Sequence, residues 1–212
     1  QVRKVYCERV MRILDLFCGA GGAGMGYHRA GFDVVGVDIS PQPNYPFEFY
    51  RGDALEYLAS YGDRFDAIHA SPPCQSSSAL TKGTNKGRHY PDLIPATREA
   101  LTRFDVPTVI ENVQGSDLRR DVTLCGEMFG LGVIRHRYFE ISRFDVPQPK
   151  HVKHRGRVAG YRHGQWFDGP YVAVYGDGGG KGSIDDWRRA MGIDWMEKKK
   201  ELAEAIPPAY TA

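Results

Sequence analysis

The chain has 212 residues, of which 42% are hydrophobic and 25% charged, and its formal net charge at pH 7 is +2. This composition is typical of one ordinary globular domain with its own core, and the apolar runs are too short to cross a bilayer. The small net charge permits nucleic-acid binding without arguing for it. The cysteines Cys7, Cys18, Cys74 and Cys125 show neither paired metal spacing nor a disulfide pattern, so we expect a reducing compartment and no metal.

Short apolar runs alternate with helical patterns along the first two thirds of the chain. The apolar runs predict buried strands, and the segments between them predict helices. This alternation is typical of a doubly wound, mostly parallel sheet with helices on both faces, which is the α/β fold class that we expect. The predicted strands are 12–17, 33–38, 47–50, 65–70, 108–110 and 138–142, and the predicted helices are 22–30, 54–60 and 92–104.

The pattern changes after residue 142. Residues 143–182 carry turn residues, scattered aromatic rings and one short strand pattern over 171–175, and helical patterns return at 184–192 and 197–205. The lysines and arginines of 143–182 outnumber its aspartates and alternate with tyrosine and tryptophan, a composition that suits phosphate contacts and base stacking. An ordinary solvated lobe is the alternative. We therefore expect a main domain over 1–142, a small lobe over 143–182, and helices over 183–212 that return to the main domain.

A strand that runs into a glycine turn and then a helix, Asp15 to Gly22, predicts a nucleoside site. Asp38 ends the next strand about twenty residues after Gly19, where a carboxylate can accept both ribose hydroxyls. Asp15 suits a sulfonium cation better than a pyrophosphate. The pattern therefore favours S-adenosylmethionine over NAD, with a glycine turn that binds no nucleoside as the alternative.

Ser71-Pro72-Pro73-Cys74-Gln75 follows a predicted strand, where a parallel sheet presents its ligand-binding loops. The two prolines hold the backbone extended, so Cys74 is a candidate nucleophile. Glu111 stands at the end of the adjacent predicted strand. A thiol and a carboxyl group in these positions suit attack on an electron-poor pyrimidine ring. His69-Ala70-Ser71 lacks the H-x-E pattern of a zinc deaminase, and the second cysteine of P-C-x-x-C is missing, so we exclude zinc.

With these motifs in order, the chain resembles the C5-cytosine DNA methyltransferases, and specifically the short forms carried by bacteriophages. The resemblance runs nearly from end to end. Its motifs are Asp15 to Gly22, Asp38-Ile39 and Gly52-Asp53-Ala54 for the cofactor, Pro72-Pro73-Cys74-Gln75 for the nucleophile, Glu111-Asn112-Val113 for the glutamate, Arg135-His136-Arg137 for the paired arginines, and Ala205-Ile206-Pro207-Pro208 for the last motif.

The resemblance implies methyl transfer from S-adenosyl-L-methionine, leaving S-adenosyl-L-homocysteine, to C5 of a cytosine flipped out of double-stranded DNA, as in restriction-modification. Cys74 would add to C6, Glu111 would protonate or hydrogen-bond N3, Arg137 would hold O2, and Arg135 would lower the pKa of the thiol. The implied cofactor residues are Asp15, Phe17, Gly19, Gly21, Gly22, Asp38, Ile39, Asp53, Ala54 and Pro72, and the implied DNA-binding residues are Gln75, Ser78, Lys82, Lys86, Arg88, Arg155 and Arg157.

We further expect a monomer that uses no membrane and acts in the cytoplasm of a bacterial or phage-infected cell. The polar loop 76–89 should be mobile without DNA and should close over the flipped base. The small lobe implies a short or relaxed target sequence.

Several alternatives stay open. In one, Asp53 caps the helix that follows it, with or without contacting adenine, and in another either arginine of the pair is a solvated residue at a strand edge. Glu204 stands where the family has an asparagine, so it either repels a carboxylated cofactor or is a helix-surface carboxylate. Three rival functions are an RNA (tRNA) cytosine methyltransferase, a silent cofactor- or DNA-binding module, and an enzyme that adds a larger group to C5.

Overall fold

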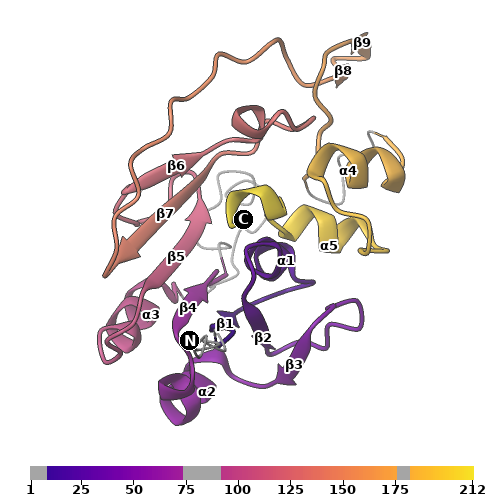
Figure 1. The fold of residues 1–212 in the computed structure, drawn as a ribbon. Coiled ribbons are helices and arrows are strands. Elements are labelled where there is room, and N and C mark those ends of the chain that lie inside the picture. The colour runs from indigo at the N-terminus through magenta and orange to yellow at the C-terminus, as the bar shows by residue number, and fades with distance from the viewer. Residues whose placement is uncertain (1–8, 74–91, 176–181) are drawn as a thin grey trace, which may run out of the picture.

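The computed structural model describes residues 9–73, 92–175 and 182–212, and this part of the chain forms one seven-stranded sheet (Figure 1). The strand order is β3-β2-β1-β4-β5-β7-β6. The first five strands in this order pair in parallel, and β7 pairs antiparallel with β5 and with β6. The strands are β1 (Arg12–Leu16), β2 (Asp33–Asp38), β3 (Glu48–Arg51), β4 (Ala67–Ala70), β5 (Thr108–Val113), β6 (Val122–Leu124) and β7 (Arg137–Ser142).

The order confirms the predicted doubly wound, mostly parallel α/β sheet. β1 pairs with β2 on one side and with β4 on the other. Strands up to β3 are therefore added toward one edge of the sheet, and strands from β4 on are added toward the other edge. In such sheets ligands bind at the carboxyl ends of the strands beside this point. The antiparallel register of β5 and β7 pairs Val113 with Arg137, so the start of β7 also lies at that edge of the sheet.

Helices cover both faces of the sheet (Figure 1). α2 (Ala54–Tyr61) and α3 (Ile94–Leu101) bury Leu58 and Leu101 against sheet residues such as Leu14, and each such leucine contributes about 1.5–3 kcal/mol. α1 (Gly22–Arg29) covers the other face, with the 3-10 turn η3 (Pro208–Tyr210) packed on it. α4 (Ile184–Met191) and α5 (Lys199–Glu204) bury Trp187 and Leu202 in a cluster of their own.

α1 is held by tertiary contacts more than by its own sequence, because it contains three glycines. A Cβ on Gly26 would lie 2.0 Å from Thr211 Oγ1, and one on Gly22 would lie 2.4 Å from the Ile206 carbonyl oxygen. Thr211 Oγ1 donates to the Ala23 carbonyl at 2.8 Å. The C-terminal segment therefore packs directly on the helix that follows β1.

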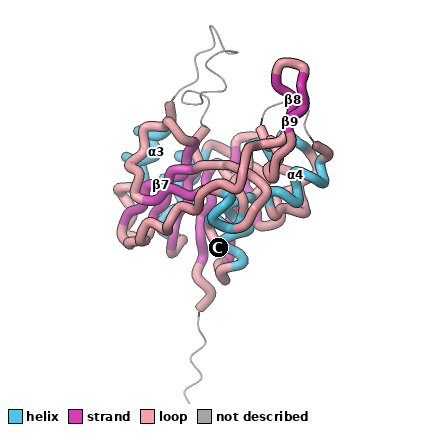
Figure 2. The backbone as a smooth tube through the Cα atoms, turned by 90° about the horizontal axis from the view of Figure 1, so that it is seen from above, coloured by secondary structure: helices cyan, strands magenta, loops and turns pink. Residues whose placement is uncertain are grey.

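The lobe sequence folds differently from the prediction. The strand predicted over 171–175 is wrong: Tyr171 makes one isolated bridge, to Val158, and its side chain is fully buried. The apolar residues there pack in the core with Trp187 rather than on a strand partner. The sequence analysis missed the hairpin of β8 (Gly160–Arg162) and β9 (Gln165–Phe167), which projects from the body in Figure 2. Its turn, His163-Gly164, has positive φ at both residues, as a type I′ hairpin requires.

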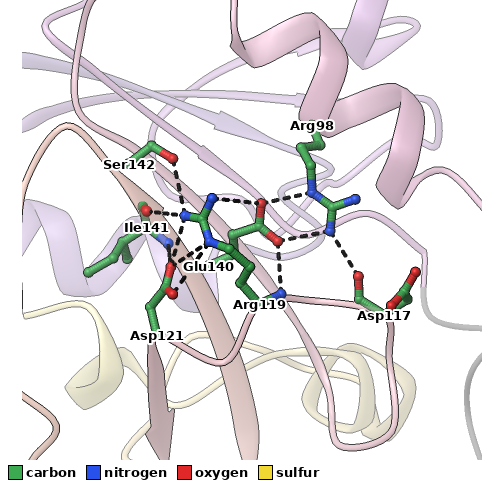
Figure 3. A network of polar contacts seen from close by, with 7 residues as sticks. All are labelled: Arg98, Asp117, Arg119, Asp121, Glu140, Ile141 and Ser142. Carbon is green, nitrogen blue, oxygen red and sulfur yellow. Dashed lines mark hydrogen bonds and ion pairs between the residues drawn. The ribbon is translucent and has the colours of Figure 1, made fainter.

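An ion-pair network around the buried Glu140 stabilises the β7 side of the sheet (Figure 3). Glu140 on β7 is only 3% exposed, and Arg98 of α3 donates to it from two nitrogens at 2.8 and 2.9 Å. The Arg119 backbone N–H adds a third hydrogen bond at 3.0 Å. Burial opposes ionisation of Glu140, but the hydrogen bonds from Arg98 and Arg119 prevail and lower its pKa.

Within 9–73, 92–175 and 182–212, none of the helices combines the length and apolar character that crossing a membrane requires.

Candidate active site

The turn after β1 forms a cradle with left-handed backbone conformations. Phe17, Gly19 and Gly21 have φ of 56°, 49° and 86°. The Gly19 N–H donates to Asp38 Oδ2 at 3.1 Å, so the end of β2 fixes the turn. A Cβ on Gly19 would meet open space, whereas Gly22 is required by its packing against Ile206. Asp38 also accepts from the Ser40 N–H at 2.8 Å, and its carboxylate has lone pairs left for hydroxyl groups.

Asp15 is buried beneath this turn. Its Oδ2 accepts a hydrogen bond from the Tyr45 hydroxyl at 3.2 Å, and its Oδ1 has no partner among the described residues. Burial raises the pKa of Asp15 to about 8, against the hydrogen bonds from Tyr45 and the Gly24 backbone. A buried carboxyl group with an unpartnered oxygen beside a glycine cradle fits a site that a cationic ligand completes.

The next two strands bring further predicted cofactor residues to the same edge. Ile39, directly after β2, is 69% exposed and offers an apolar surface there. Asp53 caps α2 by accepting from the Leu55 and Glu56 N–H groups through Oδ1 alone. The capping alternative is therefore present, and Oδ2 is not used by the cap. Ala54 and Pro72 are buried.

The predicted nucleophile Cys74 lies outside the described residues, as do Gln75, Ser78, Lys82, Lys86, Arg88 and the loop 76–89. The described chain reaches Pro73, and the position of Pro72 is well fixed. Its carbonyl accepts a buried hydrogen bond of 2.8 Å from Asn112 Nδ2, and Asn112 Oδ1 accepts from the Val113 N–H at 2.9 Å. Asn112 therefore ties the segment that leads to Cys74 to β5.

Glu111 lies within β5 rather than after it, and its side chain is buried. Arg137 Nε lies 2.9 Å from Glu111 Oε1 in an ion pair. Burial raises the pKa of Glu111, while Arg137, the Ser71 hydroxyl and Arg135 lower it by less. The carboxyl group therefore holds a proton more readily than an exposed glutamate does.

A hydrogen-bonded chain behind Glu111 was missed in the sequence analysis. Fully buried His69 contacts the Tyr27 hydroxyl through Nδ1 and the Ser71 hydroxyl through Nε2, both at 2.9 Å. Burial lowers the pKa of His69 to about 3, so the imidazole is neutral. Ser71 in turn hydrogen-bonds Glu111. A histidine on an otherwise apolar predicted strand was the available signal.

Arg135 is oriented differently from Arg137. Its two terminal nitrogens donate to the Val174 carbonyl at 2.8 Å and to the Ala203 carbonyl at 2.5 Å. Tyr210 donates to the Arg135 carbonyl at 2.6 Å. The buried Arg135 thus links the segment after the hairpin to the C-terminal helices.

The two predicted DNA contacts in the lobe are engaged within the chain. Arg155 Nε forms an ion pair with Glu127 Oε1 at 2.8 Å, and the Arg157 guanidinium lies 5.0 Å from the centre of the Phe167 ring. Glu204 is 61% exposed and lies 3.9 Å from the Lys200 amine, as in the helix-surface alternative.

Comparison with known proteins assigns this chain to a family. The model of the C-5 cytosine-specific DNA methylases matches residues 11–121, just over half of the chain. Type II methyltransferase M.AgeI of Thalassovita gelatinovora is 26% identical over 205 residues, which cover 76% of this chain and 48% of that protein. Type II methyltransferase M.FnuDI of Fusobacterium nucleatum is 29% identical over 184 residues, which cover 68% and 53%. The chain thus spans about half the length of these two relatives.

One solved structure supports the fold over the whole chain. The methyltransferase EhMeth of Entamoeba histolytica is 12% identical, with a TM-score of 0.58, and the match covers 96% of each chain.

Proposed function

Because the chain belongs to the C-5 cytosine-specific DNA methylase family, we propose that it methylates C5 of cytosine in double-stranded DNA with S-adenosylmethionine, leaving S-adenosylhomocysteine. The observation that carries the proposal is the buried pair of Glu111 and Arg137, next to Asn112, which holds the segment that leads to Cys74. Glu111 comes from β5, Arg137 comes from β7, and the segment that leads to Cys74 follows β4. These three strands are neighbours in the sheet.

The residues of the β1 and β2 ends suit the cofactor. Asp38 would accept the ribose hydroxyls, Ile39 would cover the adenine, and Asp53 Oδ2 would meet the adenine amino group. The unpartnered oxygen of Asp15 supports a cationic group nearby, and the cradle at Gly19 and Gly21 leaves backbone room. Phe17, Gly22, Ala54 and Pro72 would shape its walls. Bound S-adenosylmethionine supplies an electrophilic methyl group on a sulfonium.

The remaining chemistry falls to the catalytic side chains. The Cys74 thiolate adds to C6 of the cytosine, which raises the electron density at C5. Glu111 donates its proton to N3 during this addition, and its raised pKa supports the role. Arg137 holds O2, and after methylation loss of the C5 proton allows Cys74 to leave. Arg135 acts as a positioning residue, through its carbonyl contacts, and as a nearby positive charge.

DNA binding completes the proposal. Cytosine must be flipped out of the stack to reach Cys74. Residues 143–182 would form the target-recognition lobe beside a main domain of 1–142, with 183–212 returning to that domain. Gln75, Ser78, Lys82, Lys86, Arg88, Arg155 and Arg157 would contact DNA, and we propose a monomer that acts in the cytoplasm.

A radiolabelled-cofactor assay tests the reaction. We expect label in duplex DNA and 5-methylcytosine on mass spectrometry of the digested product. Label in tRNA alone, methylation at another atom, or a larger group at C5 would overturn the proposal.

Cys74→Ser tests the covalent step. A hydroxyl is a far weaker nucleophile, so turnover should vanish while cofactor binding persists. Duplex DNA with 5-fluorocytosine should trap the wild-type protein, because fluorine cannot leave as a proton. Active protein that escapes trapping would exclude the adduct.

A further inference from the structure

Four side chains of metal-ligand type, none of which has a role in the proposed reaction, converge on one point. The Cys125 sulfur and one ring nitrogen each of His136, His151 and His154 all lie within 4.8 Å of one another. Cys125 Sγ is 3.4 Å from His154 Nε2, and His136 Nε2 is 3.1 Å from His151 Nε2. The absence of paired cysteines in the sequence predicted no metal, whereas this set has one cysteine and widely spaced histidines.

The fold explains how distant residues meet here. Cys125 follows β6 directly and His136 precedes β7 directly, and the antiparallel ladder pairs Leu124 with Arg137. Two ligands are thus fixed by neighbouring strand ends. His151 and His154 come from the segment between β7 and β8, where neither strand nor helix is formed.

The geometry points to a structural zinc ion bound by Cys125, His136, His151 and His154. Zinc bonds of about 2.0–2.1 Å to nitrogen and 2.3 Å to sulfur give tetrahedral N–N and N–S edges of about 3.3–3.6 Å. The two short contacts are close to that length, and the 4.8 Å limit on the others leaves about 1 Å of side-chain movement.

The donor set selects the metal. One thiolate and three imidazoles suit a borderline-soft ion, and the set has no carboxylate of the kind that magnesium or calcium prefers. Four protein ligands fill a tetrahedron and leave no open position, which is typical of structural zinc rather than catalytic zinc.

Such an ion would fasten the start of the lobe to the sheet. Contacts close to the cluster also hold the lobe, and they need no metal: Tyr171 donates to Glu127 and accepts from the Arg155 N–H at 2.8 Å. His136 stands between Arg135 and Arg137, so the ion would also fix the strand start that presents Arg137 to Glu111. The inference goes beyond the proposed function, because a lobe anchor is independent of the reaction.

Zinc content tests the site directly. The full chain should be purified without a histidine tag, exposed to zinc and then dialysed. We expect it to retain one zinc ion per chain, measured by inductively coupled plasma mass spectrometry. His151→Ala removes an exposed ligand and should fold, yet should lower zinc affinity by more than the about 100-fold that loss of an outer-shell partner costs. His163→Asn is the matched control, since His163 lies in the lobe but outside the cluster, and it should keep the zinc.

Cobalt substitution adds a second readout. Cobalt in the wild-type protein should give the visible bands of a tetrahedral ion and a thiolate charge-transfer band, which Cys125→Ser should lose and Cys74→Ser should keep. Zinc that washes out of the wild-type protein, zinc that stays in His151→Ala, or a thiolate band that depends on Cys74 would overturn the inference.

Discussion

Asp15 on β1 and Glu140 on β7 are buried carboxyl groups of the same sheet, but their surroundings are opposite. Glu140 has arginine and backbone donors on both oxygens, and its pKa is lowered. Asp15 has an unpartnered oxygen, and burial raises its pKa to about 8. The β7 network is complete within the chain, whereas the β1 end has polar groups that a ligand can use. The difference separates a region built for stability from one built for binding.

Glu111→Gln should give the largest effect, and it extends the comparison to the reacting end of β5. The amide cannot donate a carboxylic proton to N3, so methylation should slow by about 10²–10⁴-fold. The free energy of unfolding should change less than in Glu140→Gln, because burial raises the pKa of Glu111 and its carboxylate is therefore less stabilised than that of Glu140. Single-turnover methylation and urea unfolding measure the two. A large loss of stability at unchanged rate would place Glu111 with Glu140.

Glu140→Gln should have the reverse profile. Losing the charge that faces Arg98 and Arg119 should lower the free energy of unfolding by about 2 kcal/mol, a reduced value because both arginines are partly exposed. Methylation by the folded protein should be unchanged. Because the folded-state pKa of Glu140 is lowered, its contribution is present at neutral pH and is lost as the pH falls through that pKa. Equal acid sensitivity in the variant would contradict this role.

Asp38→Ala tests whether the β2 end serves the ligand. Cofactor binding should weaken by roughly 1–3 kcal/mol, the cost of removing a buried hydrogen-bond partner. Calorimetry with S-adenosylhomocysteine, and with an analogue that lacks the ribose hydroxyls, measures this loss. Equal losses for both ligands would show that Asp38 only supports the Gly19 N–H.

Asp15→Asn should change the stability of the free protein with the sign opposite to that of Glu140→Gln. Burial raises the folded-state pKa of Asp15 to about 8. The free energy of unfolding of the wild-type protein therefore falls as the pH rises from the pKa of Asp15 in the unfolded chain toward about 8. The neutral amide should remove that decline and stabilise the free protein at pH 7, while cofactor binding weakens. Thermal unfolding across pH checks the sign, and a destabilised variant would contradict it.

Sequence motifs predicted the β1, β2, β4 and β5 ends, because each strand carries a short apolar run followed by a distinctive motif. The β6 strand has only three residues and shows no usable periodicity. The contact of Glu111 with Arg137 depends on the antiparallel register of β5 and β7, which local patterns do not encode. The chain through His69 and Ser71 and the cluster at Cys125 likewise depend on which strands become neighbours.

The packing of α1 has a consequence for the order in which parts of this protein fold. An eight-residue helix with three glycines gains little from its own backbone, each glycine costing about 1 kcal/mol relative to alanine. It is completed by residues 206–211, and the hydrogen bond from Thr211 to Ala23 joins positions 188 residues apart. The entropy of closing so long a loop must be lost before this contact forms. We therefore expect the helix that supports the cradle at Gly19 and Gly21 to form late in folding.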